Sequence, residues 1–375
     1  MLGNIHKRED GTMNHNKKIV LQNGKEFYGT GFGADKDAVC ELVFNTSMVG
    51  YQEIISDPTY LDQMVVMTYP IIGNYGITDE DFESKIPVIG GLIVRDYNDI
   101  PSNFRYTETL SQILEESNVP AISGLDTRML TRIIRDEGSQ VAVLTSADTP
   151  VSKAIEMIKN YKPTADAVKK VSGTKIWYSR TANPKYNIVA IDCGIKHSII
   201  RTLKAHGCNI TVVPYNTKAD EILALRPDGL LVSNGPGNPS DATCVIDTVK
   251  VLKGKLPILG IGLGHQIIAL ASGAKTYKLI CNKSGSHPVK DIKTGKIQSV
   301  CHNHSYAVDE ISLENTGLKV THKNVLDGIV EGIEDTAEKL IGFQFHPECA
   351  PGPQDAVKAF EKYIALLEAE VKKHA

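Results

Sequence analysis

A histidine and a glutamate stand two residues apart in the sequence His346-Pro347-Glu348, directly after the apolar run LIGFQF. The run is typical of a buried strand, and residues i and i+2 of a strand point to the same side. We therefore expect His346 and Glu348 to face one site. A histidine oriented by a carboxylate can deprotonate a nucleophile and later protonate a leaving amine, so the pair is a candidate for two members of a catalytic triad. The alternative is a surface histidine, which is common near strand ends.

Three glycines join an apolar strand to a helix in the run Gly260-Ile261-Gly262-Leu263-Gly264-His265-Gln266. Such a tight turn is the geometry of a nucleophile elbow, which presents its central residue at the start of the helix. The central residue here is Gly262, which adopts positive φ without strain but carries no atom that could attack a carbonyl. The sequence thus predicts the geometry of an elbow without its nucleophile.

A dinucleotide-binding glycine turn is the alternative interpretation of this loop. In a GxGxxG pattern starting at Gly260, the third glycine would fall at position 265, which is His265. The strand is also the fourth of its domain, whereas that motif follows the first. Both observations favour the elbow.

Regular alternation of elements surrounds the glycine loop in the C-terminal half. Apolar runs predict strands, and the runs between them predict helices. The expected strands are 186–192, 209–214, 229–233 and 257–261; the expected helices are 197–206, 219–225, 241–253 and 264–272, with a closing helix at 354–373. This order is typical of a parallel sheet covered on both faces, whose ligands bind at the carboxyl ends of its strands.

Short β-rich runs mix with helical stretches at 107–116 and 127–136 in the first 146 residues, which predicts a mixed α/β domain. The polar run SGTKIWYSRTANPK is rich in turn formers and indicates a domain boundary. We therefore divide the chain as follows: a tail at 1–16, in which Met13 is an alternative start, an N-terminal domain at 17–165, a linker at 166–186 and a C-terminal domain at 187–375.

Composition excludes several classes of partner. The 375 residues carry 41 basic and 44 acidic side chains, a net charge of −3, which is unsuited to nucleic acid or an anionic membrane. The seven cysteines are scattered and form no CxxC pair, so we expect a reducing, cytoplasmic location and no metal site. No apolar run approaches the roughly 18 residues of a membrane span.

Several long motifs resemble a known family. Ser233-Asn234-Gly235-Pro236-Gly237-Asn238-Pro239, the glycine loop and His346-Pro347-Glu348 are similar to the three signatures of class I glutamine amidotransferase domains. The N-terminal runs FNTSMVGYQEIISDPTY, TYPIIGNYG and GLDTRMLTRIIRDEG resemble the small subunit of carbamoyl-phosphate synthetase. The resemblance spans about residues 17 to 370. It implies a mixed α/β small-subunit domain followed by an amidotransferase domain with a central, mostly parallel sheet.

The resemblance also implies roles for individual residues. Gly262 occupies the position of the nucleophilic cysteine, and His346 and Glu348 complete the triad. The backbone amides of Gly235 and Leu263 would form the oxyanion hole. Substrate L-glutamine would be bound by Ser47, Gly235, Gly237, Leu263, Gln266, Asn303, Ser305 and Tyr306. The implied partner is the large synthetase subunit, which uses ATP, Mg²⁺ and bicarbonate; this chain would need no cofactor.

The chain departs from the family pattern at several positions. The family has cysteine at 262, glycine and phenylalanine at 305 and 306, and Gly-His-His-Gly where this chain has Cys281-Asn282-Lys283-Ser284. One explanation is a laboratory substitution at 262 alone. The other is natural loss of the glutaminase, with free ammonia as nitrogen donor, and the several changes favour it. The subunit would then be non-catalytic, retained for binding glutamine or for structure.

Two cysteines near the expected site offer a third explanation. Cys193 follows the first strand of the C-terminal domain, and Cys301 precedes Asn303 by two residues. Either thiol could replace the missing nucleophile if it ionised, although buried cysteines are commonly inert.

Overall fold

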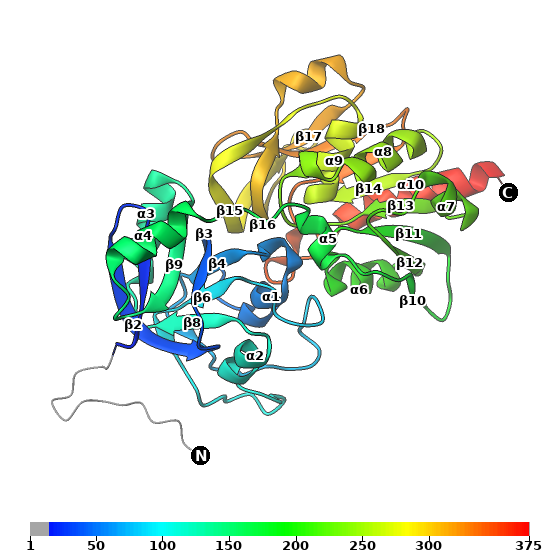
Figure 1. Cartoon of the computed structure of the whole chain (residues 1–375). Coiled ribbons are helices and arrows are strands. Elements are labelled where there is room, and N and C mark those ends of the chain that lie inside the picture. Colours follow the sequence, from blue (N-terminus) through cyan, green and yellow to red (C-terminus); the bar gives the residue numbers. More distant parts are fainter. Residues whose placement is uncertain (1–14, 375) are drawn as a thin grey trace. The chain divides into compact units, whose positions relative to one another are not determined.

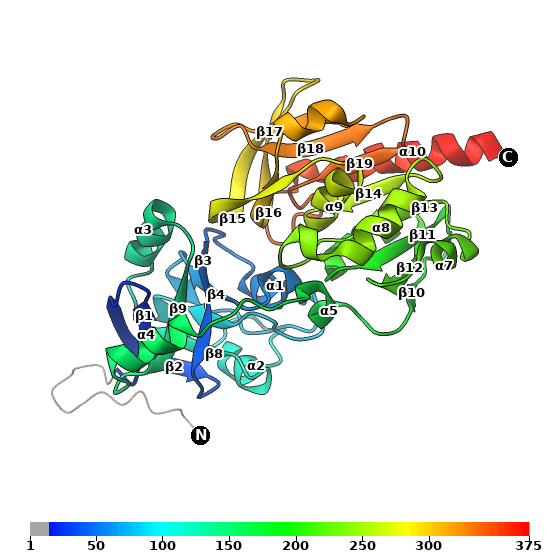
Figure 2. The same ribbon diagram turned by 45° about the horizontal axis from the view of Figure 1, so that its top comes forward.

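The computed structural model describes residues 15–374 and contains two compact units, one ending at Pro163 and one beginning at Thr164 (Figures 1 and 2). Of the expected tail at 1–16, residues 1–14, including Met13, lie outside the described residues. Among the described helices, none has the length and apolar composition required to cross a bilayer.

The N-terminal unit is built on a closed barrel of strands in the order β1-β2-β8-β6-β4-β3-β9, in which β9 pairs with both β3 and β1. The strands are β1 (Lys17–Leu21), β2 (Glu26–Gly33), β3 (Ala38–Asn45), β4 (Gln63–Met67), β6 (Gly91–Ile93), β8 (Pro120–Ser123) and β9 (Gln140–Ser146). A small separate sheet pairs β5 (Ile71–Ile72) with β7 (Asp96–Tyr97). The mixed α/β prediction for this half is confirmed, but closure into a barrel was not anticipated.

Helices pack against the barrel through their apolar sides. They are α1 (Tyr51–Ser56), α2 (Leu110–Glu116), α3 (Thr127–Glu137) and α4 (Val151–Lys159), with a 3₁₀ turn at Pro58–Tyr60. The helix expected at 107–116 begins only at Leu110, because the Thr109 hydroxyl accepts a hydrogen bond from the Gln112 amide and the Gln112 side chain accepts one from the Thr109 amide. This reciprocal capping box fixes the helix start.

The C-terminal unit contains a ten-stranded sheet in the order β10-β12-β11-β13-β14-β19-β18-β17-β15-β16. Its strands are β10 (Trp177–Ser179), β11 (Tyr186–Asp192), β12 (Cys208–Pro214), β13 (Gly229–Val232), β14 (Ile258–Ile261), β15 (Thr276–Asp291), β16 (Ile297–Val308), β17 (Lys319–Asn324), β18 (Val330–Asp335) and β19 (Leu340–Phe343). The five neighbours β12, β11, β13, β14 and β19 are parallel, and the flanking ladders are antiparallel. The predicted parallel core is thus confirmed.

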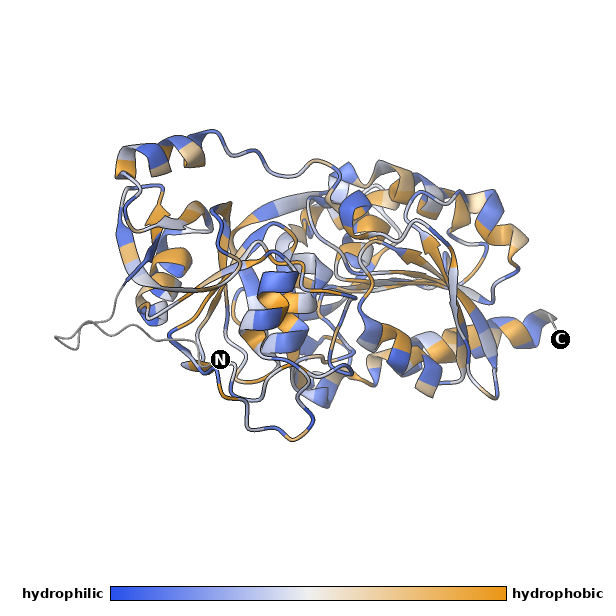
Figure 3. Ribbon diagram, turned by 60° about the horizontal axis from the view of Figure 1, so that its bottom comes forward, coloured by the Kyte–Doolittle hydropathy of each residue, from blue (hydrophilic) through white to orange (hydrophobic). Residues whose placement is uncertain are grey.

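Alternating side chains of the parallel strands supply two separate cores. Val189 and Ile191 of β11 join the core under α7, α8 and α9, whereas Ile188 and Ala190 join the core under α6 and α10. This alternation is the period of two expected for a strand buried on both faces. The helices are α5 (Ala167–Val171), α6 (His197–Ala205), α7 (Ala219–Ala224), α8 (Thr243–Leu252), α9 (Leu263–Ala271) and α10 (Ala359–His374), with 3₁₀ turns at Pro239–Asp241, Ile311–Asn315 and Gln354–Ala356. In Figure 3 the helices alternate orange and blue, while the strands between them are mainly orange.

The segment 166–186, which we expected to be a linker, contains regular structure. Helix α5 lies within it, and β10 forms an antiparallel ladder with β12 at the edge of the sheet. The sequence did not indicate this strand, because three residues are too few to show a periodic pattern. Trp177 of this strand also packs against the core under α6 and α10.

Helix α10 provides a test of the core beneath it. Tyr363 is fully buried, and its hydroxyl donates a hydrogen bond to the Leu230 carbonyl oxygen at 3.0 Å. We expect Tyr363→Phe to lower the free energy of unfolding by about 1 kcal/mol, the usual net value of one hydrogen bond. Tyr363→Ala also removes the ring and should cost about 3–5 kcal/mol.

Urea unfolding followed by tryptophan fluorescence measures this effect, because Trp177 is the chain's single tryptophan and lies in the C-terminal unit. Glu361→Gln, at an exposed position of the same helix, is the matched control and should change stability by less than about 0.5 kcal/mol. Equal effects of Tyr363→Ala and Glu361→Gln would contradict the assigned packing.

Candidate active site

The glycine loop forms a sharp turn between β14 and α9. Gly262 is the N-cap residue of α9, with φ 57° and ψ −109°, and its amide donates to the Phe343 carbonyl oxygen of β19 at 2.8 Å. Leu263 is the first helical residue, so its amide is one of the first-turn donors that have no acceptor within the helix. The turn therefore has the backbone geometry of an elbow.

The three glycines of the loop differ in the space around them. A Cβ on Gly264 would lie 2.0 Å from the Val232 carbonyl oxygen, and one on Gly260 would lie 2.5 Å from the Gly264 carbonyl, so neither position accepts a side chain. A Cβ on Gly262 would instead meet its nearest atom, Asn234 Cβ, at 3.5 Å, which is ordinary van der Waals contact. Packing therefore explains two of the glycines but leaves room for a side chain at the third.

His346 lies opposite this open position. Its Nε2 atom is 3.9 Å from the point that a Cβ on residue 262 would occupy, and Nε2 is buried without a hydrogen-bond partner among the described residues. On the other side of the ring, Nδ1 lies 2.8 Å from Glu348 Oε1. A side chain added at 262 would thus face an imidazole already oriented by a carboxylate.

The route by which His346 and Glu348 meet differs from our expectation. Strand β19 ends at Phe343, and His346 forms only an isolated bridge with Cys301, through its amide and the Cys301 carbonyl oxygen at 2.8 Å. Glu348 follows in a turn. The two side chains face one site because the turn folds Glu348 back, so the argument from strand alternation is wrong although the pair is in contact.

Lys196 is a member of this site that sequence reasoning missed. Its ammonium lies 2.9 Å from Glu348 Oε1 and donates to the Ala350 carbonyl oxygen at 2.5 Å, and the Lys196 and Glu348 side chains are both buried. Its amide donates to the Asn234 side chain at 3.2 Å. Burial alone would raise the pKa of Glu348, but the charges of Lys196 and His346 outweigh it and lower that pKa to about 2.

The loop after β13 approaches the loop after β11 closely. The Ser233 hydroxyl accepts from the Cys193 amide at 2.9 Å, and a Cβ on Gly235 would lie 2.1 Å from the Cys193 carbonyl oxygen. Glycine is therefore required at 235 for the two loops to meet. Gly237, in the same loop, has φ 87°.

Gln266 and the residues of β16 lie on neighbouring elements. The Gln266 side-chain amide donates to the Tyr306 carbonyl oxygen at 2.7 Å and to Gln344 Oε1 at 2.8 Å, which joins α9 to β16. Asn303 is buried opposite Ser284, and the Ser305 hydroxyl accepts from the Asn282 side chain at 3.0 Å. The predicted glutamine contacts of the C-terminal unit are thus drawn from a few adjoining elements.

Ser47 belongs to the N-terminal unit, in the loop between β3 and α1. Its amide donates to the Asn45 side chain at 2.7 Å, a short turn that fixes the loop backbone. Its role in binding glutamine stays a prediction.

The two cysteines considered as substitute nucleophiles are both buried thiols. Burial raises the pKa of Cys193 well above its ordinary value and that of Cys301 to about 11. The Cys301 thiol donates to the Pro351 carbonyl oxygen at 2.7 Å. Since the thiolate is the attacking form, this environment argues against either residue as a nucleophile.

Comparisons with known proteins address both halves of the chain. The family model described as "Carbamoyl-phosphate synthase small chain, CPSase domain" matches residues 19–144, and "Glutamine amidotransferase class-I" matches residues 189–366. A carbamoyl phosphate synthase pyrimidine-specific small chain of Halalkalibacterium halodurans is 45% identical over 354 residues, covering 94% of this chain and 97% of the relative.

The chain belongs to the carbamoyl-phosphate synthase small chain family. A small chain of Bacillus thuringiensis is 46% identical over 353 residues, covering 94% of this chain and 96% of that one. One of Oceanobacillus iheyensis is 45% identical over 354 residues, covering 94% and 96%. The family assignment, drawn at first from motifs, is thereby confirmed, and with it the amidotransferase class of the C-terminal unit.

One further group of buried residues was not anticipated from the sequence, from which we expected no metal site. His302, His304 and Glu331 bring one ligand atom each within 4.8 Å of one another, and all three are buried. Burial raises the pKa of Glu331 to about 8 and lowers that of His304 to about 3. The spacing of the two histidines, i and i+2 in a strand, was the available signal.

The buried Glu348 carboxylate predicts a specific dependence of stability on pH. Its pKa is about 2 in the folded chain and near 4.5 when unfolded, so its stabilising contribution is present above pH 4.5 and is lost as the pH falls towards 2. Glu348→Gln leaves the Lys196 ammonium buried without its carboxylate. We expect the free energy of unfolding of this variant to be lower by about 3–5 kcal/mol near neutral pH. The difference in unfolding free energy between the variant and the unsubstituted chain should decrease between pH 4.5 and 2.

Urea midpoints measured by Trp177 fluorescence across that range test this prediction. Glu361→Gln removes an exposed carboxyl and is the control for general charge effects. A difference in unfolding free energy that stayed constant from pH 6 to pH 2 would show that Lys196 does not hold the Glu348 carboxylate in its charged form.

Proposed function

We propose that this chain is an amidotransferase-type subunit that binds the large carbamoyl-phosphate synthetase subunit but does not itself hydrolyse glutamine. Ammonia is then the working nitrogen donor. ATP, Mg²⁺ and bicarbonate are used by the large subunit, this chain needs no cofactor, and the complex works in the cytoplasm. Membership of the small-chain family over both halves of the chain supports the choice of partner.

One observation carries the proposed loss of chemistry. The elbow, the His346–Glu348 pair and the space for a side chain at 262 are all present, yet residue 262 is glycine. Hydrolysis of glutamine by this class of site begins with attack of a thiolate on the amide carbonyl. Since Gly262 has no side-chain atom, that step lacks its nucleophile. In a protease triad, removal of the nucleophile lowers the rate by roughly 10⁶.

The remaining groups support binding of glutamine without its hydrolysis. The Gly235 and Leu263 amides would donate hydrogen bonds to the amide oxygen of glutamine, a role that needs backbone donors and no particular side chain. The contacts proposed for the rest of the substrate within the C-terminal unit come from Gly237, Gln266, Asn303, Ser305 and Tyr306. Such a site would keep glutamine as a ligand.

Paired nitrogen-donor assays test the proposed function. With its cognate large subunit, the full-length chain should support carbamoyl phosphate synthesis from ammonia, while synthesis from glutamine stays at the background of the large subunit alone. The expected glutamine-dependent rate is lower by about 10⁵–10⁶ than that of a cysteine-containing relative assayed in parallel. A glutamine-dependent rate similar to that of the relative would overturn the proposal.

A substitution at 262 tests whether the rest of the site remains competent. Gly262→Cys places a thiol opposite His346 Nε2, and Gly262→Ser supplies the same backbone strain, about 1–3 kcal/mol for a side chain at this positive φ, without a thiolate. We expect the cysteine variant, and not the serine variant, to be alkylated by iodoacetamide at residue 262. Measurable hydrolysis of glutamine by the cysteine variant would favour a substitution at 262 alone, and its absence would favour wider loss of the site.

The His346→Gln change, combined with Gly262→Cys, is the matched control and should slow alkylation at 262. If Gly262→Cys binds glutamine but hydrolyses none, Ser305→Gly and Tyr306→Phe are the next changes to combine with it, because these positions also depart from the family pattern. Failure of Gly262→Cys to react with iodoacetamide would contradict the proposed orientation of His346.

A further inference from the structure

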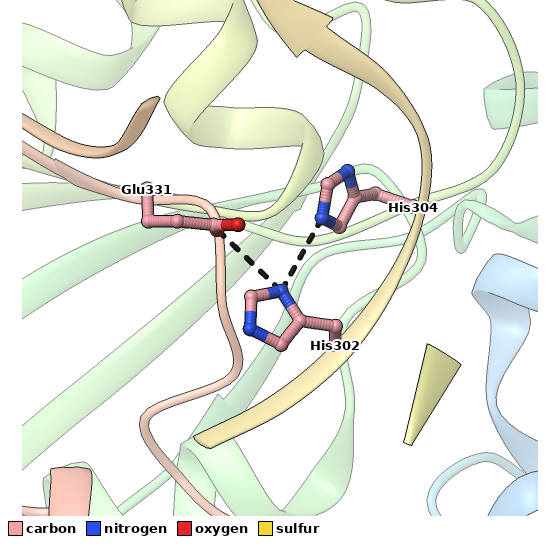
Figure 4. Close-up of side chains that lie close together, drawn as sticks. All are labelled: His302, His304 and Glu331. Atoms are coloured by element: carbon pink, nitrogen blue, oxygen red, sulfur yellow. Dashed lines mark hydrogen bonds and ion pairs between the residues drawn. The ribbon is translucent and has the colours of Figure 1, made fainter. Parts of the chain in front are cut away.

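Besides the His346–Glu348 pair, the C-terminal unit contains a buried cluster of potential metal ligands. His302 and His304 come from β16, and Glu331 comes from β18 (Figure 4). Their exposed fractions are 3%, 5% and 0%. A carboxylate and two imidazoles gathered in the interior require some charged or hydrogen-bonded compensation.

Two of the three distances within the cluster have lengths expected for ligands of one metal ion, and all three ligand atoms lie within 4.8 Å of one another. His302 Nδ1 lies 3.3 Å from His304 Nε2 and 3.4 Å from Glu331 Oε2. Ligands placed tetrahedrally at the usual zinc bond lengths of about 2.0–2.1 Å are roughly 3.3–3.4 Å apart. A direct hydrogen bond from an imidazole would instead be about 2.7–3.2 Å long. Both separations therefore match the edges of a coordination tetrahedron, and both are longer than the usual hydrogen bond of an imidazole.

A second layer of contacts orients two of the ligand atoms. His304 Nδ1 lies 2.8 Å from the Tyr306 carbonyl oxygen, so Nδ1 carries the proton and the Nε2 lone pair faces the cluster. Glu331 Oε1 accepts from the Asn324 side chain at 3.4 Å, whereas Oε2 is buried without a hydrogen-bond partner among the described residues. Such outer contacts are the usual way in which proteins orient metal ligands.

Lys283 is the cation that competes most directly with a metal here. Its ammonium is 3.7 Å from Glu331 Oε1 but 2.5 Å from Asp327 Oδ2, so its main partner is Asp327. The nearer oxygen of Glu331 is Oε1, not the Oε2 atom that faces His302. Lys283 and Asp327 therefore balance each other and leave Oε2 for another cation.

The cluster joins strands that are not neighbours in the sheet. β17 and β15 lie between β18 and β16 in the strand order, and the side chains nevertheless meet because the sheet curls back. The same curl brings Cys301 of β16 to the amide of His346 at 2.8 Å. An ion bound by this cluster would fix the position of β16 relative to β18. Asn303, Ser305 and Tyr306 lie on the same strand β16.

We propose that His302 Nδ1, His304 Nε2 and Glu331 Oε2 bind one divalent transition-metal ion of the zinc class. Two imidazoles and a carboxylate suit zinc, and three protein ligands leave one tetrahedral position for water. This inference is independent of the proposed function, because it concerns the curl of the sheet and requires no turnover.

The full-length chain, dialysed against a chelator, is titrated with ZnCl₂ and separately with CoCl₂. We expect one equivalent of zinc per chain, and a visible cobalt spectrum of tetrahedral type without the intense thiolate band that a cysteine ligand would produce. Each of His302→Gln, His304→Gln and Glu331→Gln should weaken zinc binding by more than about 100-fold, beyond the loss typical of an outer-contact change.

Two control variants make the outcome decisive. His322→Gln changes a histidine on β17 outside the cluster and should leave the zinc affinity unchanged. Lys283→Met removes the competing ammonium and should leave zinc binding equal or tighter. Glu331→Gln preserves side-chain volume, so it tests the site even if a histidine variant folds poorly, as judged by Trp177 fluorescence.

The opposite results would overturn the proposal. They are the absence of stoichiometric zinc binding by both the unsubstituted chain and Lys283→Met, or binding that persists in all three ligand variants. The first would show that the cluster is held by hydrogen bonds alone, and the second would place the metal on other residues.

Discussion

The buried ion pair between Lys196 and Glu348 is the interaction on which the site of the C-terminal unit depends. A carboxylate in the interior stays charged only if an opposite charge and hydrogen bonds compensate its lost hydration. Lys196 provides that charge at 2.9 Å, and Glu348 in turn orients His346 at 2.8 Å. Because Lys196 follows β11 and Glu348 follows β19, the pair also ties together loops from opposite sides of β13 and β14.

Much of the C-terminal fold could be predicted because its strands are buried on both faces. Runs such as Tyr186–Asp192 are nearly continuous in apolar residues, and their bounds in the structure agree with the prediction. Hydrophobic patterns do not predict strands where the segment buries few apolar side chains. The three-residue strand β10 lies at an edge, and its pairing with β12 depends on the completed sheet rather than on its own sequence.

The site shows the same division between local and long-range information. The elbow at Gly262 could be predicted because consecutive residues determine its geometry. Lys196 could not, since its contact with Glu348 spans 152 positions of the chain and exists only after the parallel strands align. Likewise, the i and i+2 spacing of His302 and His304 is visible in the sequence, whereas Glu331 reaches them only through the curl of the sheet.

Alternating side chains of strand β16 make contacts on two different faces of the strand. His302 and His304 point to the Glu331 side, while the side chains of Cys301 and Asn303 belong to its other face. A shift of one residue in the pairing of β16 with β15 would exchange these faces. The register of this one ladder therefore decides which residues meet Glu331 and which face away from it, without any change in the residues themselves.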